Sequence, residues 1–185
     1  MTNAPRLIGL YSSAPASGKT TIANYLNNHG YRTISFASPL KTMVRVFLRE
    51  FGLHHETIDQ YLFINKEYPI PEVGVSARHL CQTLGTEWGR ACVHPEIWVN
   101  VWRRGVESSL KRGIDVVADD CRFPNEFRTI KELGGEIWRI ERPGFVFSGS
   151  HVSEGALNHH HFDHVVTNDA NLTQLYAYVR SRISA

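Results

Sequence analysis

Short apolar runs alternate along the chain with longer stretches of helical periodicity. The apolar runs, which predict strands, lie at residues 6–11, 114–118, 136–140 and 164–167. Helical patterns begin at about Lys19, at Pro124 and after Asn171. Strands that alternate with helices in this way are typical of a parallel sheet with crossover helices. The pattern therefore predicts an α/β fold.

A helix-rich stretch at residues 39–111 separates the first strand and helix from the later ones. It is too long for a simple crossover, so we interpret it as an inserted substrate-binding region within a single domain that spans residues 1–185. The last helix has a clear start, because Asn171 is a favourable N-cap. Its predicted core positions are Leu172, Leu175, Tyr176, Val179 and Ile183.

The segment Ser17-Gly18-Lys19-Thr20 follows the first apolar run directly. In a phosphate-binding loop (P-loop), consecutive backbone N–H groups face the phosphates, and the next helix presents its positive N-terminal end to them. A lysine reaches the outer phosphates, which is the expected role of Lys19, and a hydroxyl such as that of Thr20 binds Mg²⁺. Thr21 then continues into the helix.

One position departs from the usual P-loop pattern. The first glycine of G-x-x-x-x-G-K-[ST] is replaced by Ser13. Ala14, Ala16 and Ser17 keep the loop free of bulk, so the backbone can still approach a phosphate if Ser13 does not require a positive φ. The alternative interpretation is an ordinary polar turn between a strand and a helix.

Composition and charge narrow the class of protein. The chain has 185 residues, of which 42% are hydrophobic, and its formal net charge is +2. So small a charge gives no global basic field, and we expect neither a nucleic-acid polymer nor a membrane as partner. No apolar run has bilayer length, and residues 1–5 lack the features of a signal peptide, which predicts a cytoplasmic protein. Three cysteines favour free thiols: Cys81, Cys92 and Cys121.

Two acidic residues, Asp119 and Asp120, follow the predicted buried strand at residues 114–118. In open α/β folds, ligands bind at the carboxyl ends of the strands. One of the two carboxylates is therefore expected to face a Mg²⁺–phosphate site or an acceptor, with the Arg122 guanidinium at the same edge before Pro124 begins a helix. A solvated turn with an incidental salt bridge is the competing interpretation.

Residues 76–90 predict a helix capped by Ser76 with two distinct faces. Leu80, Leu84 and Trp88 recur on an apolar face. The second face is polar and carries a cation, an amide and a hydroxyl, with a glycine beside them. A glycine within a helix indicates either close approach of another group or an early helix end. This polar face, which either binds a ligand or is simply solvated, consists of Arg78, Gln82, Gly85 and Thr86.

Tryptophans and histidines in the remaining sequence have mostly structural interpretations. Trp98 and Trp102 are expected to be core residues of a helix over residues 95–111, together with Ile97, Val101 and Val106. Stacking of Trp98 on a base is a secondary option. The histidines at 159–161 and 164 follow no familiar zinc spacing, and a mobile, solvated loop is the preferred interpretation. Cys92-Val93-His94 is likewise too sparse for a metal site.

Over nearly its whole length the chain resembles the bacteriophage deoxynucleoside monophosphate kinases. The resemblance rests on motifs in a consistent order rather than on the P-loop alone. These motifs are Phe36-Ala37-Ser38-Pro39-Leu40-Lys41, Lys66-Glu67, Arg78 to Arg90 with its core Gln82 and Leu84-Gly85-Thr86-Glu87, Trp98, Asp120-Cys121-Arg122-Phe123-Pro124-Asn125-Glu126, Gly134-Gly135, Arg142-Pro143-Gly144, His151-Val152-Ser153-Glu154 and Thr167-Asn168-Asp169.

The resemblance implies a P-loop kinase fold of three α/β/α layers with a mostly parallel central sheet and a helical substrate-binding insertion. It implies transfer of the ATP γ-phosphoryl group to a deoxynucleoside monophosphate (dNMP), with ATP and Mg²⁺ bound. It also implies a lid-like segment over about residues 142–162. A homodimer is one option for the oligomeric state.

The resemblance assigns roles to individual positions as well. The catalytic groups it implies are Lys19, Arg78, Asp120 and Arg122. The ATP-binding residues are Ser13, Ala16, Ser17, Gly18, Lys19, Thr20, Thr21 and Asn168, with Asn168-Asp169 bordering the adenine and Thr20 on the metal. The acceptor nucleotide is expected at Lys66, Arg78, Gln82, Gly85, Thr86, Trp98 and Asp120.

Two other functions remain open at this point. A P-loop kinase could instead phosphorylate a hydroxyl, as on a nucleoside or a dephospho-coenzyme A-like molecule, with Asp120 as catalytic base. A non-catalytic nucleotide-binding switch would bind nucleotide without forming an acceptor-dependent product. The polar face that begins at Arg78 would have no evident use in such a switch.

Overall fold

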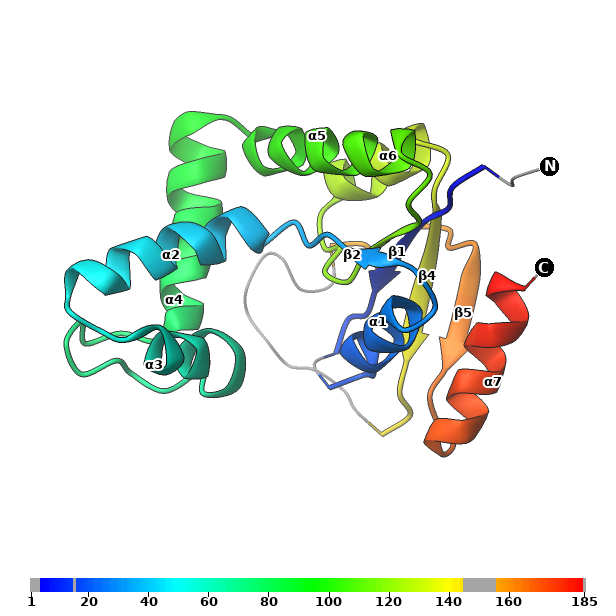
Figure 1. The fold of residues 1–185 in the computed structure, drawn as a ribbon, viewed down its shortest axis with the longest axis horizontal. Helices are drawn as coiled ribbons and strands as arrows, with labels where there is room; N and C mark the ends of the chain where they lie inside the picture. The colour runs from blue at the N-terminus through cyan, green and yellow to red at the C-terminus, as the bar shows by residue number, and fades with distance from the viewer. Residues whose placement is uncertain (1–3, 15, 145–155, 185) are drawn as a thin grey trace. The chain divides into compact units, whose positions relative to one another are not determined.

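A computed structural model describes residues 4–14, 16–144 and 156–184 of this chain (Figure 1). Their contacts divide the chain into two compact units. One unit, here called the sheet unit, comprises the chain up to Phe36 and from Trp102 onward. The other, the helical unit, comprises Ala37–Val101. We describe each unit separately.

The sheet unit contains a five-stranded sheet in the order β2-β3-β1-β4-β5, and every neighbouring pair is parallel. The four predicted strands are confirmed, although β3 is shorter than expected. A further strand, β2, was not predicted because it has only two residues and no apolar run. The strands are β1 (Leu7–Tyr11), β2 (Arg32–Thr33), β3 (Val116–Ala118), β4 (Glu136–Glu141) and β5 (His164–Thr167).

Helices cover both faces of this sheet, so the predicted three-layer α/β/α arrangement is confirmed. Helices α1 (Lys19–Asn27) and α7 (Leu172–Ile183) pack on one face in a core with alternate residues of the strands. Helix α6 (Pro124–Glu132) packs on the other face, where a Cβ on Gly9 would lie 2.6 Å from Ile130 Cδ1. A glycine in the middle of β1 thus lets α6 approach the sheet closely.

Helix α7 begins as its sequence predicts. The Asn171 side chain accepts a hydrogen bond from the Gln174 amide at 3.1 Å, and Leu175 and Val179 are buried. The prediction for Leu172 is wrong, since its side chain is 58% exposed. Leu172 is the first residue of α7, and its side chain does not pack against the sheet.

Helices make up most of the helical unit. Its elements are α2 (Ser38–Glu50), α3 (His55–Asp59), the π-helix η1 (Gln60–Ile64), α4 (Ala77–Gln82), the π-helix η2 (Thr83–Val93) and the beginning of α5 (Ile97–Lys111). A small separate core holds them together, formed by Val44, Leu48, Ile58, Leu62, Ile70 and Ala77. The expected helix-rich character of this stretch is confirmed.

Helix α5 runs from the helical unit into the sheet unit. Trp98, Trp102 and Val106 are buried as predicted, whereas Val101 is 50% exposed and was wrongly assigned to the core. In the sheet unit, the Trp102 indole stacks on Phe36 at 4.1 Å between ring centroids and donates a hydrogen bond to the Ile34 carbonyl at 2.8 Å. These contacts hold the segment after β2 in place.

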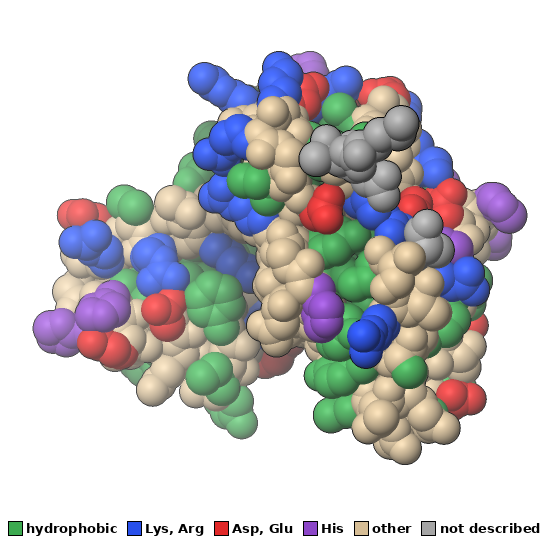
Figure 2. All heavy atoms as spheres, turned by 45° about the vertical axis from the view of Figure 1, so that its right-hand side comes forward, with side chains coloured by type: hydrophobic (Ala, Val, Ile, Leu, Met, Phe, Trp, Pro, Cys, Tyr) green, Lys and Arg blue, Asp and Glu red, His purple; other side chains and the backbone are tan. Residues whose placement is uncertain are grey.

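The surface carries charges of both signs. Lys and Arg side chains on the face shown in Figure 2 lie in groups interspersed with acidic and apolar side chains. Among the described residues, no helix is both long and apolar enough to cross a membrane. Cys81, Cys92 and Cys121 are all free thiols, as their number suggested.

Candidate functional site

The loop between β1 and α1 has the backbone of a tight phosphate-binding turn. Gly18 has φ of 108°, and Ala16 is the one described non-glycine residue with positive φ, at 53°. Ser13 is not among the positive-φ residues, so a glycine is not needed there. The departure from the usual motif at this position is therefore compatible with the turn.

Gly18 immediately precedes α1, and two features of the structure favour glycine at this position. Its φ of 108° disfavours any side chain, and a Cβ at this position would lie 2.6 Å from Asn168 Nδ2. The side-chain amide of Asn168 donates a hydrogen bond through Nδ2 to the Ser17 carbonyl at 2.8 Å. The loop is thus in contact with the segment that follows β5, a contact between residues distant in the sequence.

Lys19 is the first residue of α1 and is half-buried in the sheet unit. Its ammonium donates to Ser17 Oγ at 3.3 Å. Burial is the largest cause that lowers the pKa of Lys19 to about 8, and the Arg122 charge lowers it further, while Asp119 and Asp120 act in the opposite direction. A cation that burial has partly stripped of water is well suited to receive an anionic ligand.

Asp119 and Asp120 lie at the carboxyl end of β3, as predicted. Asp119 Oδ1 accepts a hydrogen bond from Ser35 Oγ at 2.5 Å, and Asp120 Oδ1 accepts one from the Phe36 amide at 2.8 Å. Both carboxylates act electrostatically on Lys19, as does Arg122. The structure therefore brings these predicted residues together with the loop, each carboxylate held by a defined donor rather than freely solvated.

The sequence interpretation gave no role to Glu126, which holds the turn after β3. Its carboxylate is buried and accepts hydrogen bonds from the Arg122 amide at 2.7 Å and the Phe123 amide at 3.1 Å. An acidic residue two positions after Pro124 at a helix start was the available signal, because such residues commonly bond back to the preceding amides. Glu126 thereby fixes the backbone that carries Arg122.

Within the helical unit, the start of the predicted polar face is confirmed. Ser76 caps α4 by accepting a hydrogen bond from the His79 amide at 3.2 Å. The Arg78 Nε lies 2.8 Å from Glu67 Oε1, and the Arg78 amide donates to the Lys66 carbonyl at 3.0 Å. These contacts place Lys66 beside Arg78 although twelve positions separate them.

The second half of this segment departs from the prediction. An α-helix was expected to continue to Arg90, but the chain changes at Thr83 into the π-helix η2. A π-helix has more residues per turn, so positions four apart gradually turn away from a common face. Leu80 and Leu84 pack against the small core, whereas Trp88 is 44% exposed and does not complete the apolar face.

The close approach suggested by Gly85 is explained by side chains of the helical unit. A Cβ on Gly85 would lie 3.1 Å from Leu40 Cδ1, and one on Gly89 would lie 2.4 Å from the Trp98 ring. The Trp98 indole is 4% exposed and donates to the Gly85 carbonyl at 2.8 Å. The environment of Trp98 is that of a core residue, which was the preferred interpretation.

Two of the histidines considered for a metal site, His160 and His164, pack against aromatic rings. His160 lies against Phe127 with 4.8 Å between ring centroids, and His164 meets the Trp138 ring edge-on at 5.5 Å. His94 Nδ1 accepts from the Glu96 amide at 3.1 Å. In the ranges that the structure describes, no group of three His, Cys, Asp or Glu residues could hold a metal ion.

The structure describes the two ends of the predicted lid-like segment, residues 142–144 and 156–162. Residues 145–155, which include His151 to Glu154, lie outside the described residues. Before them, Arg142 Nη1 donates to the Ala16 carbonyl of the loop at 3.0 Å. After them, Asn158 Oδ1 accepts from the Tyr11 hydroxyl at 2.6 Å, and Phe162 stacks on Tyr11 at 5.2 Å between ring centroids.

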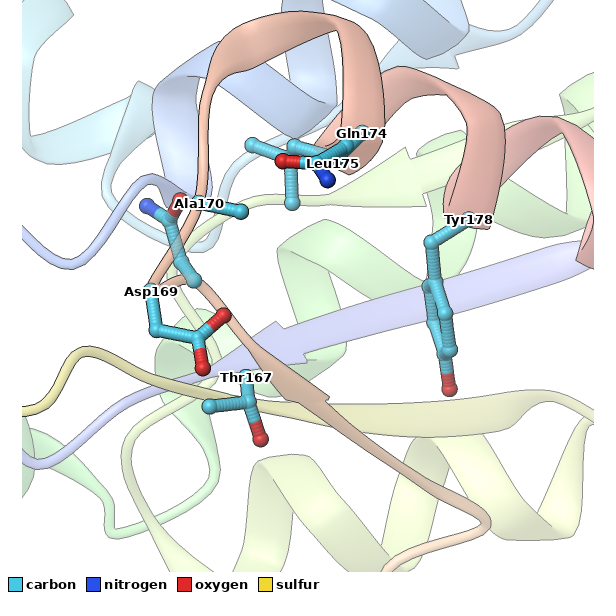
Figure 3. Close-up of a pocket in the computed structure, with 7 residues that line it drawn as sticks. Thr167, Asp169, Ala170, Gln174, Leu175 and Tyr178 are labelled. Carbon is cyan, nitrogen blue, oxygen red and sulfur yellow. The ribbon is translucent and has the colours of Figure 1, made fainter.

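A pocket of about 210 Å³ lies between the end of β5 and α7 (Figure 3). The labelled side chains of Thr167 and Asp169 come from the strand end, and Gln174, Leu175 and Tyr178 come from the helix. Asn168 also lines this pocket. The pocket therefore adjoins the phosphate-binding loop through a residue that contacts both.

Comparison with known proteins gives concordant findings. A family model described as deoxynucleotide monophosphate kinase matches residues 54–179. A protein of Acanthamoeba polyphaga mimivirus, provisionally named as the same kind of kinase, is 32% identical over 95% of this chain and 94% of its own length. The deoxynucleotide monophosphate kinase of Enterobacteria phage T4 is 26% identical over 58% of this chain but only 45% of the phage protein.

Among solved structures, TT1252 from Thermus thermophilus has a similar fold. The TM-score is 0.51 with 17% sequence identity, and the superposition covers 98% of each chain. At this identity the likeness concerns the fold alone.

Proposed function

Because the chain belongs to the deoxynucleotide monophosphate kinase family, we propose that it transfers the γ-phosphoryl group of ATP to a deoxynucleoside monophosphate, giving a deoxynucleoside diphosphate and ADP. The observation that carries the ATP half of this proposal is the loop geometry. Positive φ at Ala16 and Gly18 leads into a helix whose first residue is a partly desolvated lysine. This combination suits a polyphosphate.

The sheet unit supplies the proposed ATP site. The triphosphate would bind along Ser13, Ala16, Ser17, Gly18, Lys19, Thr20 and Thr21, with Lys19 on the outer phosphates. The pocket between β5 and α7 has room for part of the adenine, and Asn168 and Asp169 border it. The pocket's polar groups would then orient the base beside a triphosphate that the loop holds.

Mg²⁺ fits the donor groups at this site. Thr20 is exposed in the first turn of α1, and the carboxylates of Asp119 and Asp120 are close enough to influence Lys19. Hydroxyl and carboxylate oxygens are the ligands that Mg²⁺ prefers. When bound, the metal ion would neutralise charge on the phosphates.

The acceptor nucleotide is proposed to bind side chains of the helical unit. Arg78 and Lys66 are adjacent there and would attract its phosphate. Trp98 is buried and hydrogen-bonded to the Gly85 carbonyl, so we propose that it supports the acceptor site through packing rather than by stacking on the base. The proposed acceptor residues of this unit are Lys66, Arg78, Gln82, Gly85 and Thr86.

Phosphoryl transfer to a phosphate acceptor requires alignment and positive charge more than proton transfer. Such an acceptor is already ionised near neutral pH, so no general base is needed. Lys19, Arg78 and Arg122 would provide the charge, and the hydrogen bonds that Asp119 and Asp120 accept would keep the turn after β3 rigid. Exclusion of water would favour transfer over hydrolysis.

A product assay tests this proposal. Purified protein is incubated with Mg²⁺, ATP and each of the four common deoxynucleoside monophosphates, their ribose counterparts, nucleosides or dephospho-coenzyme A. The proposal predicts diphosphate products from at least one deoxynucleoside monophosphate, and ADP formation that depends on the acceptor. Products from hydroxyl acceptors alone would instead favour Asp120 as catalytic base, and nucleotide binding with no product would favour a switch.

A further inference from the structure

Two successive carbonyl groups of the phosphate-binding loop are held by side chains from elsewhere in the sheet unit. Arg142 Nη1 donates to the Ala16 carbonyl at 3.0 Å, and Asn168 Nδ2 donates to the Ser17 carbonyl at 2.8 Å. Arg142 directly follows β4, and Asn168 directly follows β5. The loop is thus contacted from the carboxyl ends of two neighbouring strands.

Because the peptide bond is planar, a contact that holds a carbonyl group also fixes the direction of the following N–H. In a trans peptide the C=O and the following N–H point in opposite directions within one rigid plane, and the described residues contain no cis peptide. When the Ala16 carbonyl is held on one side, the Ser17 N–H must face the other side. In the same way, the hydrogen bond from Asn168 to the Ser17 carbonyl makes the Gly18 N–H face away from Asn168.

Asn168 is well placed to impose this orientation. The backbone N–H of Asn168 donates a hydrogen bond to the Glu141 carbonyl at 2.7 Å, and this bond attaches the residue to the end of β4. Its side chain also packs so closely on Gly18 that a Cβ there would lie 2.6 Å from Nδ2. Asn168 therefore contacts the loop both by a hydrogen bond and by packing, and it does so from a fixed backbone position.

We propose that Asn168 is a positioning residue that aims the Gly18 amide at the phosphates by holding the Ser17 carbonyl away from them, with Arg142 acting in parallel on the preceding peptide. This inference rests on the proposed function and refines it. It makes the contribution of Asn168 to nucleotide binding independent of the base. Bordering the adenine pocket is then secondary to its contact with the loop.

The distinguishing ligand is inorganic tripolyphosphate, which has the phosphate chain of ATP but no base. Calorimetry would measure the dissociation constants of the magnesium complexes of ATP and of tripolyphosphate for the wild type and for Asn168→Ala. We expect both ligands to bind roughly tenfold more weakly to the variant, the usual range for one lost hydrogen bond to a binding group. In kinase assays, KM for ATP should rise by a similar factor while KM for the acceptor stays unchanged.

Arg6→Ala is the matched control. Arg6 pairs with Glu136 at 2.9 Å and donates to the Arg182 carbonyl at 3.0 Å, so this variant loosens the same unit at the amino ends of β1 and β4, away from the loop. Its thermal stability should fall while its affinity for both ligands is retained. A general loss of structure in Asn168→Ala would lower its melting temperature and affect the acceptor KM too.

Three outcomes separate the possibilities. Equal weakening of both ligands by Asn168→Ala supports the inference. Weakening of ATP alone, with normal tripolyphosphate binding, would overturn it and assign Asn168 to the base, and unchanged affinity for both would overturn it as well. If the wild type itself binds neither ligand and forms no diphosphate product, it is the proposed function that fails.

Discussion

The phosphate-binding loop and the helical unit differ in which groups would contact their proposed ligands. The loop is held by backbone geometry and by side chains anchored at strand ends, such as Asn168. The helical unit instead presents long side chains, among them Arg78, from helices that include two π-helical segments. Interrupted helices of this kind are frequent at functional sites. The comparison indicates a preformed loop for the proposed donor, whereas binding of the proposed acceptor would depend on individual side chains.

The largest effect is expected at the loop. Lys19→Ala should lower kcat by about a thousandfold, because a charge that stabilises the transferring phosphoryl group is lost. Steady-state kinetics at saturating ATP and acceptor measure this effect. The variant should fold normally, since it no longer buries a cation. A kcat within a few fold of the wild-type value would show that the loop does not act on the transferring group.

A change in the helical unit should affect the acceptor selectively. Arg78→Ala is expected to raise KM for the acceptor by roughly 10- to 100-fold, in line with loss of a charge-assisted contact to a phosphate. The dissociation constant of MgATP should not change. Glu67→Gln is the control, because it removes the ion pair with Arg78 while leaving the guanidinium in place. Equal losses of ATP and acceptor binding in Arg78→Ala would contradict the division of roles.

The pKa of Lys19, lowered to about 8 chiefly by burial, predicts a pH dependence of nucleotide binding. Above that pH the ligand-free protein loses the ammonium charge, so MgATP affinity should fall by up to about tenfold per pH unit. Titration calorimetry from about pH 7.5 to about pH 9 measures this change. Lys19→Arg keeps its charge and should show little pH dependence over the same interval, even if it binds more weakly.

The free energy of unfolding should rise with pH, whereas the affinity for MgATP falls. The unfolded chain holds the Lys19 proton more tightly than the folded chain, because the folded-state pKa is lowered from 10.5 to about 8. Between these values the unfolded state binds more protons, so this side chain makes the ligand-free protein more stable as the pH rises. The difference in unfolding free energy between the wild type and Lys19→Met, followed by denaturant titration across that range, isolates this contribution.

The smallest catalytic effect is expected from Trp98→Phe. The substitution keeps an aromatic ring but leaves the buried Gly85 carbonyl without the indole donor, at a cost of about 1–3 kcal/mol in unfolding free energy. Acceptor KM should rise by less than about threefold if packing is the role of Trp98. Denaturant titration and acceptor kinetics together check this. An unchanged stability with a large rise in acceptor KM would instead place the indole on the substrate.

Much of the sheet unit could be predicted from local patterns. The strands at β1, β3, β4 and β5 are apolar runs, and α7 begins at an N-cap whose hydrogen bond the structure shows. Strand β2 escaped prediction because two residues carry no periodicity. The exposure of Leu172 could not be read from spacing either, since it depends on where a helix end meets the sheet.

The candidate site was predictable in its parts but not in its connections. Lys19, Asp119, Asp120 and Arg122 were all named from sequence, and the last three act electrostatically on Lys19. The contact of Asn168 with the loop joins residues that only the tertiary fold brings together.

In the helical unit, the expectation of 3.6 residues per turn failed at η2. A π-helix has a different period, so the predicted apolar face does not extend to Trp88. Close packing of Gly89 against Trp98 depends equally on tertiary contacts that spacing does not reveal.

The central claim is that the loop leading into Lys19 binds the triphosphate of ATP. Calorimetric titration of MgATP into the folded wild-type protein, with Lys19→Ala measured in parallel, tests it most directly. The account predicts saturable binding by the wild type and a marked loss in the variant. Absence of binding by the wild type, or equal binding by both proteins, would contradict it.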